Sequence, residues 1–465
     1  MLPNDQDDDL RAYQEEDVAT LSRTAKSGEK RIQFNASVAY GKSVVIKKLS
    51  KAYSQQRRPV LVLSNRSAVT DQLRSKTAHL PGVRVMTVQA ADRHRDELAR
   101  NPAHLVLADE IHMGGAAAQY GRVFDCSPDA LVVGFTGTPT PELYDVFPAS
   151  VEGKGARWLT DEGWLSELLY HTPSKLDLRG VAMRKGEYDD AAVVRLLEER
   201  RVYGKTLDSY REHGLGLPTL GFCVNVKHAM DTAEQFRAAG HRCEVLIGED
   251  SKREVQRKIE ALGDGGLVFS VDKVSAGFDL PDLRVILSLR PTASEQLWVQ
   301  QLGRVARVSD GKPYGMVIDH VGNSRRLGTL TEKRDWRNLE KTKAQRLTAD
   351  GDRLSVRTCD ACMRTFEAGP SCCPSCGVSL AKDTRIPKAE SIRLEQVAAE
   401  QLEQEREAEK ALRKRQGQTI AQMRAYLGHE TAVKNMRSRY DKALRNGDEV
   451  VASFAREQLR QARAL

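Results

Sequence analysis

RIQFNASVAYGKSVVIKKL, residues 31–49, is the stretch of sequence that decides the fold. Its first part carries apolar Ile32 and Phe34, a turn of small residues follows, and Gly41-Lys42-Ser43 opens an amphipathic run. A strand, a small-residue loop, Gly-Lys-Ser and a helix form the layout of a phosphate-binding loop. Backbone N–H groups at a helix start bind anions, the lysine reaches the β- and γ-phosphates, and the hydroxyl binds Mg²⁺. The segment therefore predicts a site for a nucleoside triphosphate and Mg²⁺.

The loop departs from the usual pattern at one position, because Ala36 stands where that pattern has glycine. The added methyl group is tolerable unless the turn needs a positive φ at this residue. Gly-Lys-Ser also occurs by chance in unrelated sequences, so the motif alone does not separate a nucleotide site from an ordinary turn. The rest of the chain has to decide between these two interpretations.

The composition bounds the class of protein. A chain of 465 residues is too long for one hydrophobic core and indicates several domains. Hydrophobic residues make up 40% of it without a long unbroken apolar run, and the acidic N-terminus lacks the apolar core of a secretory signal. These features predict a cytoplasmic protein. The formal net charge of +8 is compatible with a polyanionic partner but does not require one.

The predicted fold class is α/β, with two parallel-sheet domains in tandem. Short continuous apolar runs that alternate with amphipathic segments are typical of buried parallel strands between helices. The first such domain covers residues 1–148 and the second covers residues 218–346, with a more helical connector at 149–217. Residues 355–382 hold a cysteine cluster, and residues 388–465 form a highly charged helical tail.

Asp109 and Glu110 directly follow the apolar run at residues 105–108. Acidic residues at the carboxyl end of a parallel strand lie where open α/β sheets bind ligands. Asp109 can hold Mg²⁺ through water and Glu110 can polarise the attacking water, which is the division of labour that phosphoryl transfer needs. An ordinary polar loop is the alternative, and the upstream Gly-Lys-Ser makes it the weaker one.

Two arginines in the second domain have the chemistry to act on the same nucleotide. Arg304 and Arg307 are three residues apart, which predicts that they share one helical face. Guanidinium groups aimed at a γ-phosphate neutralise charge in the transition state of phosphoryl transfer. Two solvated arginines on a surface helix are the alternative interpretation.

These motifs, in this order, resemble those of superfamily 2 helicases of the DEAD/DEAH type. The resemblance is strongest to the branch that holds the type III restriction motor, Rad25-like repair helicases and phage-encoded helicases, and it runs from about residue 10 to residue 328. The matching segments are Tyr13-Gln14, Gly41-Lys42-Ser43, Asp109-Glu110-Ile111-His112, Thr136-Gly137-Thr138-Pro139, Ser275-Ala276-Gly277-Phe278-Asp279-Leu280-Pro281 and residues 300–307.

The resemblance implies two RecA-like domains with ATP and Mg²⁺ between them, in a bacterial or phage-infected cell. It implies that Gln14 reads the adenine, that Gly277 and Asp279 contact the ribose and strand backbone, and that Arg304 and Arg307 are arginine fingers. The residues that it implies couple hydrolysis to domain movement are His112, Thr136, Thr138 and Gln300.

The resemblance also implies where a nucleic-acid strand is gripped. Polar residues follow several strands at the edge where the family holds the strand backbone, and such phosphate contacts position the strand without reading its sequence. They are Ser64, Asn65, Arg66, Thr87 and Gln89 in the first domain and Asn225 and Lys227 in the second. For any one of them, a polar loop tip is an equally good explanation.

Cys359, Cys362, Cys373 and Cys376 form a pair of CxxC motifs with a short loop between them. Four thiolates give tetrahedral Zn²⁺ coordination, and so small a loop could hardly fold without metal. Cys372 could replace Cys373 in this set, although Cys373 preserves the CPxCG form. We expect a structural zinc ribbon.

The function that these patterns predict is an ATP-hydrolysing motor that moves along a nucleic-acid strand, with DNA favoured over RNA. A protein partner for the charged tail is a further expectation. Two alternatives remain: a nucleic-acid-binding protein that no longer hydrolyses ATP, and the motor subunit of a restriction system.

Overall fold

The computed structural model describes residues 10–77, 79–111, 117–173, 176–184, 186–199, 202–263, 265–271, 282–338, 353, 355–380 and 429–462. The chain divides into two compact units, Met1–Leu380 and Ala381–Leu465. Both parallel-sheet domains and the cysteine cluster lie in the first unit, and a pair of helices lies in the second.

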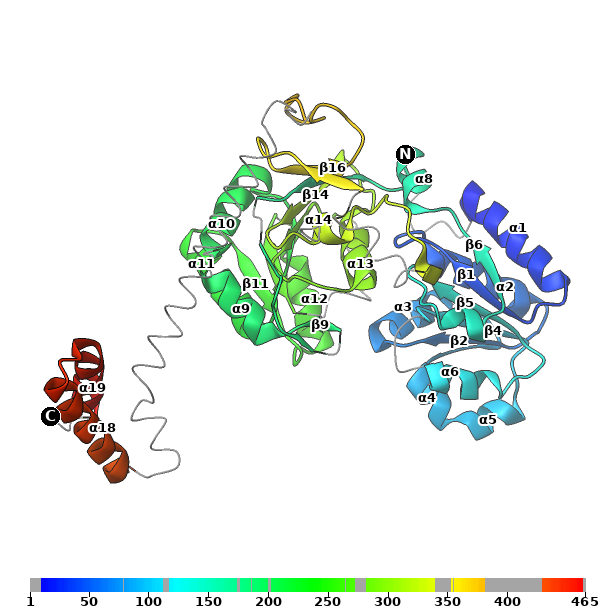
Figure 1. Cartoon of the computed structure of the whole chain (residues 1–465). Coiled ribbons are helices and arrows are strands. Elements are labelled where there is room, and N and C mark those ends of the chain that lie inside the picture. The colour runs from blue at the N-terminus through cyan, green and yellow to red at the C-terminus, as the bar shows by residue number, and fades with distance from the viewer. Residues whose placement is uncertain are drawn as a thin grey trace. The chain divides into compact units, whose positions relative to one another are not determined.

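The first sheet has six parallel strands in the order β3-β2-β4-β5-β1-β6 (Figure 1). The strands are β1 (Arg31–Asn35), β2 (Val60–Ser64), β3 (Val83–Thr87), β4 (Leu105–Asp109), β5 (Leu131–Thr136) and β6 (Ala149–Glu152). The helices of this domain are α1 (Ala12–Lys26), α2 (Lys42–Gln55), α3 (Ser67–Thr77), α4 (Val88–Arg93), α5 (Arg95–Arg100), α6 (Ala117–Phe124) and α7 (Leu143–Val146).

Both faces of this sheet are buried, which explains the continuous apolar runs in the sequence. Successive side chains of a strand point to opposite faces. In β2, Val60 and Val62 therefore pack in one cluster with α1, α2 and α3, whereas Leu61 and Leu63 pack in another with α4, α5 and α6. The predicted α/β class of this domain is confirmed.

The second sheet has eight strands in the order β11-β12-β10-β13-β14-β7-β16-β15. It is parallel from β11 to β7, and β16 and β15 are antiparallel to their neighbours. The strands are β7 (Glu167–His171), β10 (Thr219–Phe222), β11 (Cys243–Leu246), β12 (Leu267–Ser270), β13 (Val285–Ser288), β14 (Tyr314–Asp319), β15 (Val356–Thr358) and β16 (Arg364–Glu367).

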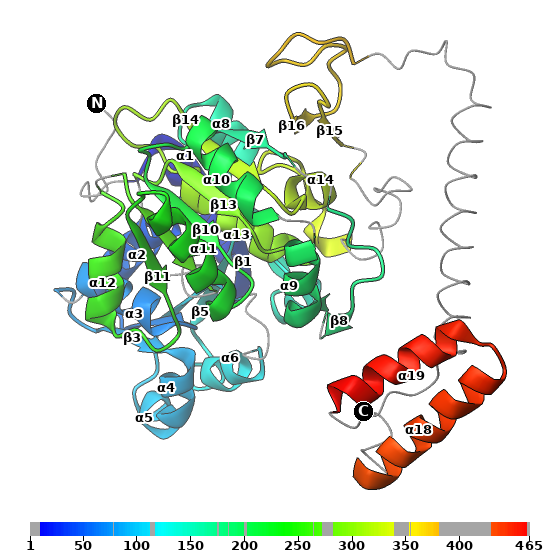
Figure 2. The ribbon, with the colours of Figure 1, turned by 90° about the vertical axis from the view of Figure 1, so that its left-hand side faces the viewer.

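Helices cover both faces of the second sheet as well (Figure 2). Side chains of α10 and α11 pack on one face, and side chains of α12 and α13 pack on the other. These helices are α10 (Val202–His213), α11 (Val226–Ala238), α12 (Lys252–Glu260) and α13 (Glu295–Val305), and the unit also contains α8 (Ala156–Asp161), α9 (Asp190–Glu199), α14 (Asn323–Leu327) and the 3₁₀ helix η2 (Trp336–Asn338).

The segment expected to be a helical connector does more than link the two domains. Its first residues form β6 in the first sheet, and β7 pairs in parallel with β14 in the second sheet. Further on, the short strands β8 (Met183–Arg184) and β9 (Glu187–Tyr188) form a separate hairpin. Polar residues interrupt the apolar pattern of β6 and β7, because each strand is buried on part of its length only, so the sequence did not reveal them.

The second unit contains α18 (His429–Arg445) and α19 (Glu449–Gln461), which pack against each other. Its core consists mainly of Ala432, Met436, Ala455 and Leu459. These helices agree with the expected helical character of the tail, and residues 388–428, which precede them in the tail, lie outside the described residues. Within the described part of the chain, no helix combines the length and apolar character needed to cross a membrane.

Candidate ATP site and cysteine cluster

Three strands of the first sheet bring the predicted catalytic motifs to one edge. In the strand register Asn35 pairs with Thr136 and Asp109 pairs with Phe135, so β1, β4 and β5 end side by side. The phosphate loop follows β1, Glu110 follows β4 and the Thr-Gly-Thr segment follows β5. Because the strands are parallel, all three motifs lie at the carboxyl edge, where this kind of sheet binds ligands.

The phosphate loop tolerates the alanine that replaces its usual first glycine. Ala36 is buried and does not have a positive φ, so its methyl group causes no backbone strain. The left-handed residues of the loop are Ala39, at φ 59°, and Gly41, at φ 92°. A side chain at Gly41 would also collide with Gln14, since a Cβ there would lie 2.7 Å from its Nε2. Glycine is therefore required at 41 and not at 36.

Helix α1 fastens the phosphate loop from one side. The side chains of Tyr13 and Gln14 both donate hydrogen bonds to the carbonyl of Tyr40, at 2.9 and 3.0 Å. The Tyr40 hydroxyl in turn donates to Asp17 at 2.7 Å. In this structure the amide of Gln14 also accepts from the Arg11 N–H at 3.0 Å and is almost fully buried. These contacts hold the loop in shape, and the reading of adenine by Gln14 stays a prediction.

Lys42 and Glu110 form an ion pair in the centre of the candidate site. The Lys42 Nζ lies 2.9 Å from the Glu110 Oε1, and the two side chains are 11% and 30% exposed. A Cβ on Gly137 would lie 3.2 Å from the same Nζ, so the Thr-Gly-Thr segment closes over the lysine. Glu110 has a φ of 51°, which is an uncommon backbone conformation for this residue type and one that is enriched at functional sites.

Asp109 lies beneath this pair and is buried. Burial, together with the neighbouring Glu110 carboxylate, raises the pKa of Asp109 above its usual range, and Lys42 opposes that shift. A divalent cation would have the opposite effect, because it stabilises the ionised carboxylate. The hard oxygen donors of Ser43 and Asp109 are the kind that Mg²⁺ prefers, so these residues fit the ion. The Nζ of Lys76 on α3 lies 3.4 Å from the Ser43 Oγ and adds a cation there.

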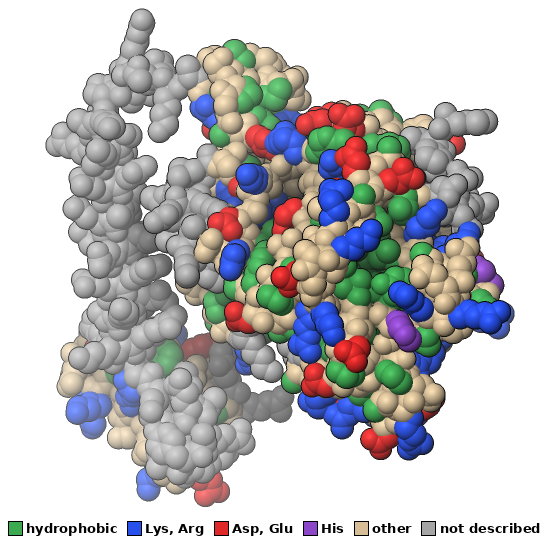
Figure 3. Space-filling view, turned by 90° about the vertical axis from the view of Figure 1, so that its right-hand side faces the viewer, with side chains coloured by type: hydrophobic (Ala, Val, Ile, Leu, Met, Phe, Trp, Pro, Cys, Tyr) green, Lys and Arg blue, Asp and Glu red, His purple; other side chains and the backbone are tan. Residues whose placement is uncertain are grey.

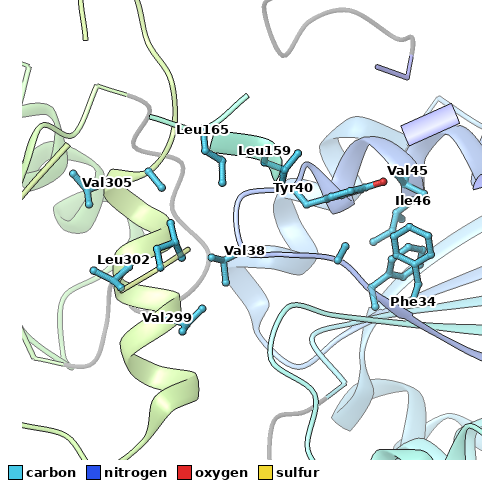
Figure 4. Close-up of a cluster of buried hydrophobic side chains, with 14 of the residues drawn as sticks. Phe34, Val38, Tyr40, Val45, Ile46, Leu159, Leu165, Val299, Leu302 and Val305 are labelled. Atoms are coloured by element: carbon cyan, nitrogen blue, oxygen red, sulfur yellow. The ribbon is translucent and has the colours of Figure 1, made fainter. Parts of the chain in front are cut away.

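Helix α13 of the second domain contacts the phosphate loop directly. Figure 4 shows Val38 of the loop pointing toward Val299 and Leu302 of this helix. All three belong to one buried apolar cluster, and Gln300 donates a hydrogen bond to the Thr138 Oγ1 at 3.4 Å. Within the Thr-Gly-Thr segment, the Thr138 N–H donates a hydrogen bond to the Thr136 Oγ1 at 3.1 Å. The predicted coupling residues Thr136, Thr138 and Gln300 therefore form one connected set.

The two arginines do not share a helical face as their spacing predicted. Helix α13 ends at Val305, so Arg304 lies in its last turn and Arg307 lies beyond the helix. Arg307 instead forms an isolated β-bridge with Leu165, and its carbonyl accepts a hydrogen bond from Ser166. At this end Lys312 donates to the carbonyl of Val305 and the Ser166 N–H donates to the carbonyl of Ala306, which are contacts that the spacing of the arginines could not show.

The predicted strand-gripping residues of the first domain lie at the carboxyl ends of β2 and β3. Gln89 donates a hydrogen bond to the Asn65 Oδ1 at 2.7 Å, so these two amides are brought together. The Ser64 hydroxyl bonds to the backbone of Arg66, and the Thr87 hydroxyl caps α4 by accepting from the Ala90 N–H. On the face drawn in Figure 3, basic and acidic side chains are interspersed, so charge alone does not mark a path there.

In the second domain, Asn225 caps α11, because its Oδ1 accepts from the His228 N–H at 2.9 Å. Lys227, in the first turn of the same helix, is exposed. His112, Gly277 and Asp279 lie outside the described residues, so the roles implied for them stay predictions.

The four cysteines of the two CxxC motifs come together as a potential metal site. Their sulfur atoms all lie within 4.8 Å of one another, with Cys359 Sγ 3.7 Å from Cys376 Sγ and Cys362 Sγ 3.6 Å from Cys373 Sγ. Sulfur atoms at about 2.3 Å from a tetrahedral Zn²⁺ would be about 3.8 Å apart. The donor set and spacing therefore fit zinc.

Cys372, the alternative ligand, is exposed and is not part of this group. Burial raises the pKa of the Cys373 thiol, but N–H groups of Cys376 and Ser375 that donate to its sulfur bring the pKa below its usual range. This environment favours the thiolate form that binds metal. The cluster is built onto the second sheet, because β16 pairs with β7 and the Thr172 N–H donates to the carbonyl of Met363 at 2.7 Å.

The fold and the site together define a class of protein with two RecA-like domains and a phosphate loop in the first, against which a helix of the second domain packs. Comparisons with known families support this. The family model of the type III restriction enzyme res subunit matches residues 7–82 and 77–141, and that of the helicase conserved C-terminal domain matches residues 205–309. The chain belongs to the superfamily 2 helicases.

Individual relatives are distant but cover much of the chain. A "51.5 kDa protein" of a Lactococcus phage is 27% identical over 369 residues, which is 76% of this chain and 79% of the relative. The putative ATP-dependent helicase IRC3 of Saccharomyces cerevisiae is 23% identical over 68% of this chain. The chain spans about half the length of that yeast protein, with 52% of it covered.

Solved structures share the fold. A fragment of a putative HsdR subunit of a type I restriction enzyme from Vibrio vulnificus matches with a TM-score of 0.57 and 18% identity, covering 70% of this chain and 66% of that one. The type ISP restriction-modification enzyme LlaBIII, solved bound to DNA, matches with a TM-score of 0.51 and 14% identity over 71% of this chain and 29% of its own.

Sequence reasoning missed several residues that shape the site. Val38 and Tyr40 belong to no motif, although one contacts α13 and the other anchors the loop to α1. Ser166 and Lys312, which bond to the backbone near Arg307, carry no motif at all. Their roles come from contacts between segments far apart in the sequence, and no local pattern reveals such contacts.

Proposed function

We propose that this chain hydrolyses ATP between its two RecA-like domains and uses the cycle to move along one strand of nucleic acid, with DNA as the favoured substrate. The observation that carries the proposal is the juxtaposition of Lys42, Glu110 and Asp109 with Thr138, which is bonded to Gln300 of the second domain. A site made from two domains can convert the bound nucleotide into relative domain movement.

The residues divide the chemistry among them. Lys42 and the N-terminus of α2 would bind the β- and γ-phosphates, while Ser43 and Asp109 would hold Mg²⁺, which offsets the charge on the phosphates. Glu110 would orient and deprotonate the attacking water. Arg304 and Arg307 would stabilise the charge that develops on the γ-phosphate as the bond to the leaving group breaks.

Movement along a strand would follow from alternate gripping by the two domains. Asn65 and Gln89 at the edge of the first sheet and Lys227 at the edge of the second would hold the phosphate backbone. DNA is favoured because the matches include restriction enzymes, one of them solved bound to DNA. Because these contacts address the backbone, we expect little dependence on base sequence.

A steady-state ATPase assay with no nucleic acid, single-stranded DNA or single-stranded RNA tests the proposal, with Lys42→Ala as the control for contaminating activity. We expect turnover that DNA stimulates more than RNA does. Stimulation by RNA alone would assign the chain to RNA. ATP binding without turnover under all three conditions would favour the alternative function, in which the chain binds nucleic acid but does not hydrolyse ATP. A restriction-motor role predicts co-purification with a methyltransferase or nuclease.

We also propose that the cysteine cluster is a structural zinc ribbon that stabilises the edge of the second sheet. All four protein ligands are thiols, which leaves no open position for a substrate. The tail helices α18 and α19 are proposed to bind a protein partner. A pull-down with residues 381–465 removed from the chain tests that role, since a partner that is still retained would exclude it.

A further inference from the structure

Helix α13 is held at its N-terminus by a carboxylate from outside every helicase motif. Glu187, in β9 of the connector hairpin, accepts three hydrogen bonds at the start of the helix. Its Oε1 accepts from the Thr292 hydroxyl at 2.7 Å and the Ser294 N–H at 3.1 Å, and its Oε2 accepts from the Ala293 N–H at 3.1 Å. A negative charge at this end is also favoured by the helix dipole.

The C-terminus of the same helix is held by a buried lysine. The Lys312 Nζ donates to the carbonyls of Val305 and Arg307, each at 2.7 Å. Helix ends leave carbonyl groups unpaired and carry partial negative charge, so an amine is well placed there. Burial, with the nearby charges of Arg284 and Arg307, lowers the pKa of Lys312 to about 7. The neutral amine keeps two N–H donors, so both hydrogen bonds can persist across this range.

The backbone of Arg307 is fixed on a second side by the segment that leads into β7. The Ser166 N–H donates to the Ala306 carbonyl at 2.8 Å, its hydroxyl donates to the Arg307 carbonyl at 3.2 Å, and Leu165 forms a β-bridge with Arg307. The carbonyl of Arg307 therefore accepts from both Lys312 and Ser166. Two side-chain donors from different segments therefore fix the backbone of Arg307 just beyond the end of α13.

Fixing both ends matters because α13 is short and faces the phosphate loop. Eleven residues span about 16 Å, so a shift at either end changes the position of the whole helix. The face between the two ends touches Val38 of the phosphate loop and Thr138. Misplacement of a catalytic group by about 1 Å can cost about a hundredfold in rate. The two charged contacts thus lie where they control the distance from Arg304 and Arg307 to the nucleotide.

We propose that Glu187 and Lys312 are positioning residues for the arginine-finger segment, and that Lys312 acts mainly through Arg307. This inference rests on the proposed ATPase function. Glu187 also ties α13 to the β8–β9 hairpin, so the connector between the domains takes part in placing the arginines.

The main test is a double-mutant cycle in the full-length chain. Lys312→Met keeps the length of the side chain but removes its donors, and Lys333→Met alters an exposed lysine as the matched control. We expect Lys312→Met to lower kcat about tenfold with the KM for ATP within about twofold. Combined with Arg307→Ala, it should add little to the loss from Arg307→Ala alone, because both changes remove the same contribution. A kcat equal to that of the control, or losses that multiply, would overturn the proposal.

The same comparison at the other end uses Glu187→Gln against Glu199→Gln, an exposed glutamate on α9. The amide keeps the size of the side chain, but its NH₂ group cannot accept the third hydrogen bond. We expect kcat to fall severalfold in Glu187→Gln and to be partly restored in Glu187→Asp, which keeps the carboxylate. No fall in kcat, or an equal fall in Glu199→Gln, would remove Glu187 from the proposal.

Hydrogen–deuterium exchange separates this inference from the proposed function, because it needs no ATPase activity. In Lys312→Met we expect faster exchange confined to the last turn of α13 and residues 306–308, with the rest of the second sheet unchanged. Unchanged exchange in that segment would overturn the positioning role even in an active enzyme. Faster exchange there in a protein without ATPase activity would keep the positioning role and refute the motor.

Discussion

Val38 of the phosphate loop lies against the backbone of Gly303 in α13, so closely that a Cβ placed on Gly303 would be 2.7 Å from the Val38 Cβ. Neither atom belongs to a flexible side-chain end, so the two segments could not adjust without moving apart. The absence of a side chain at residue 303 is therefore what allows the second domain to contact the nucleotide loop in this arrangement.

Gly303→Ala should reduce ATP turnover by keeping α13 away from the loop. Overpacking of a close contact costs about 1–3 kcal/mol, which corresponds to a loss of the closed state of roughly fivefold to 150-fold. The measurement is kcat with nucleic acid present, with Gly121→Ala on α6 as the control, because a Cβ there meets nothing within 4 Å. Adding Val38→Gly should restore part of the activity, and a fully active Gly303→Ala would show that this contact does not form during turnover.

Glu110→Gln should abolish hydrolysis and spare ATP binding. The amide cannot take a proton from water, and general-base groups contribute about 10²–10⁴ to rate, so turnover should fall by that order. Binding should be equal or tighter, because Lys42 is released from its ion pair with Glu110 and remains available to the phosphates. A fluorescent ATP analogue measures binding in the same samples, and Glu162→Gln is an exposed control. Comparable rates in Glu110→Gln and wild type would remove Glu110 from the mechanism.

Cys373→Ser should release zinc, whereas Cys372→Ser should retain about one zinc per chain. The two residues are adjacent, but only Cys373 has its sulfur in the cluster of four. Metal analysis of the two purified proteins gives the ratio. Because β16 extends the second sheet through β7, loss of zinc should also lower the melting temperature of the second domain. Equal zinc content in both variants would contradict the ligand assignment.

The sequence predicted the architecture, and the meeting of the phosphate loop with Asp109 and Glu110 at one sheet edge, for a physical reason. Buried parallel strands require continuous apolar runs, and phosphate loops require a fixed local order of residues, so both leave a pattern within a few positions. The pairing of β7 with β14 and the contact between Val38 and Gly303 leave no such pattern, because they join segments more than 100 residues apart. The end of α13 leaves no local pattern either, since the groups that bind the carbonyls there, Ser166 and Lys312, come from other segments.

His228 should make the second domain sensitive to mild acid. Its side chain is buried, and its Nδ1 accepts a hydrogen bond from the Val224 N–H at 3.2 Å, which requires the neutral ring. Burial lowers the pKa of His228 to about 4, with Asp231 opposing the shift. The unfolded chain, with a pKa of about 6.5, binds a proton first as the pH falls. The stabilisation is therefore complete above about pH 6.5 and is lost as the pH falls toward 4, by about 2 kcal/mol at pH 5.

The measurement is the fall in melting temperature between pH 7 and pH 5, compared among wild type, His228→Asn and the exposed control His79→Asn. The asparagine Oδ1 can still accept the Val224 N–H but does not titrate, so His228→Asn should lose several degrees less than wild type over this range. Acid release of the proposed zinc would lower the melting temperature of all three proteins alike. Its effect therefore cancels when the falls in melting temperature are compared. If wild type and His228→Asn lose the same number of degrees, His228 is not the group that makes the domain acid-sensitive.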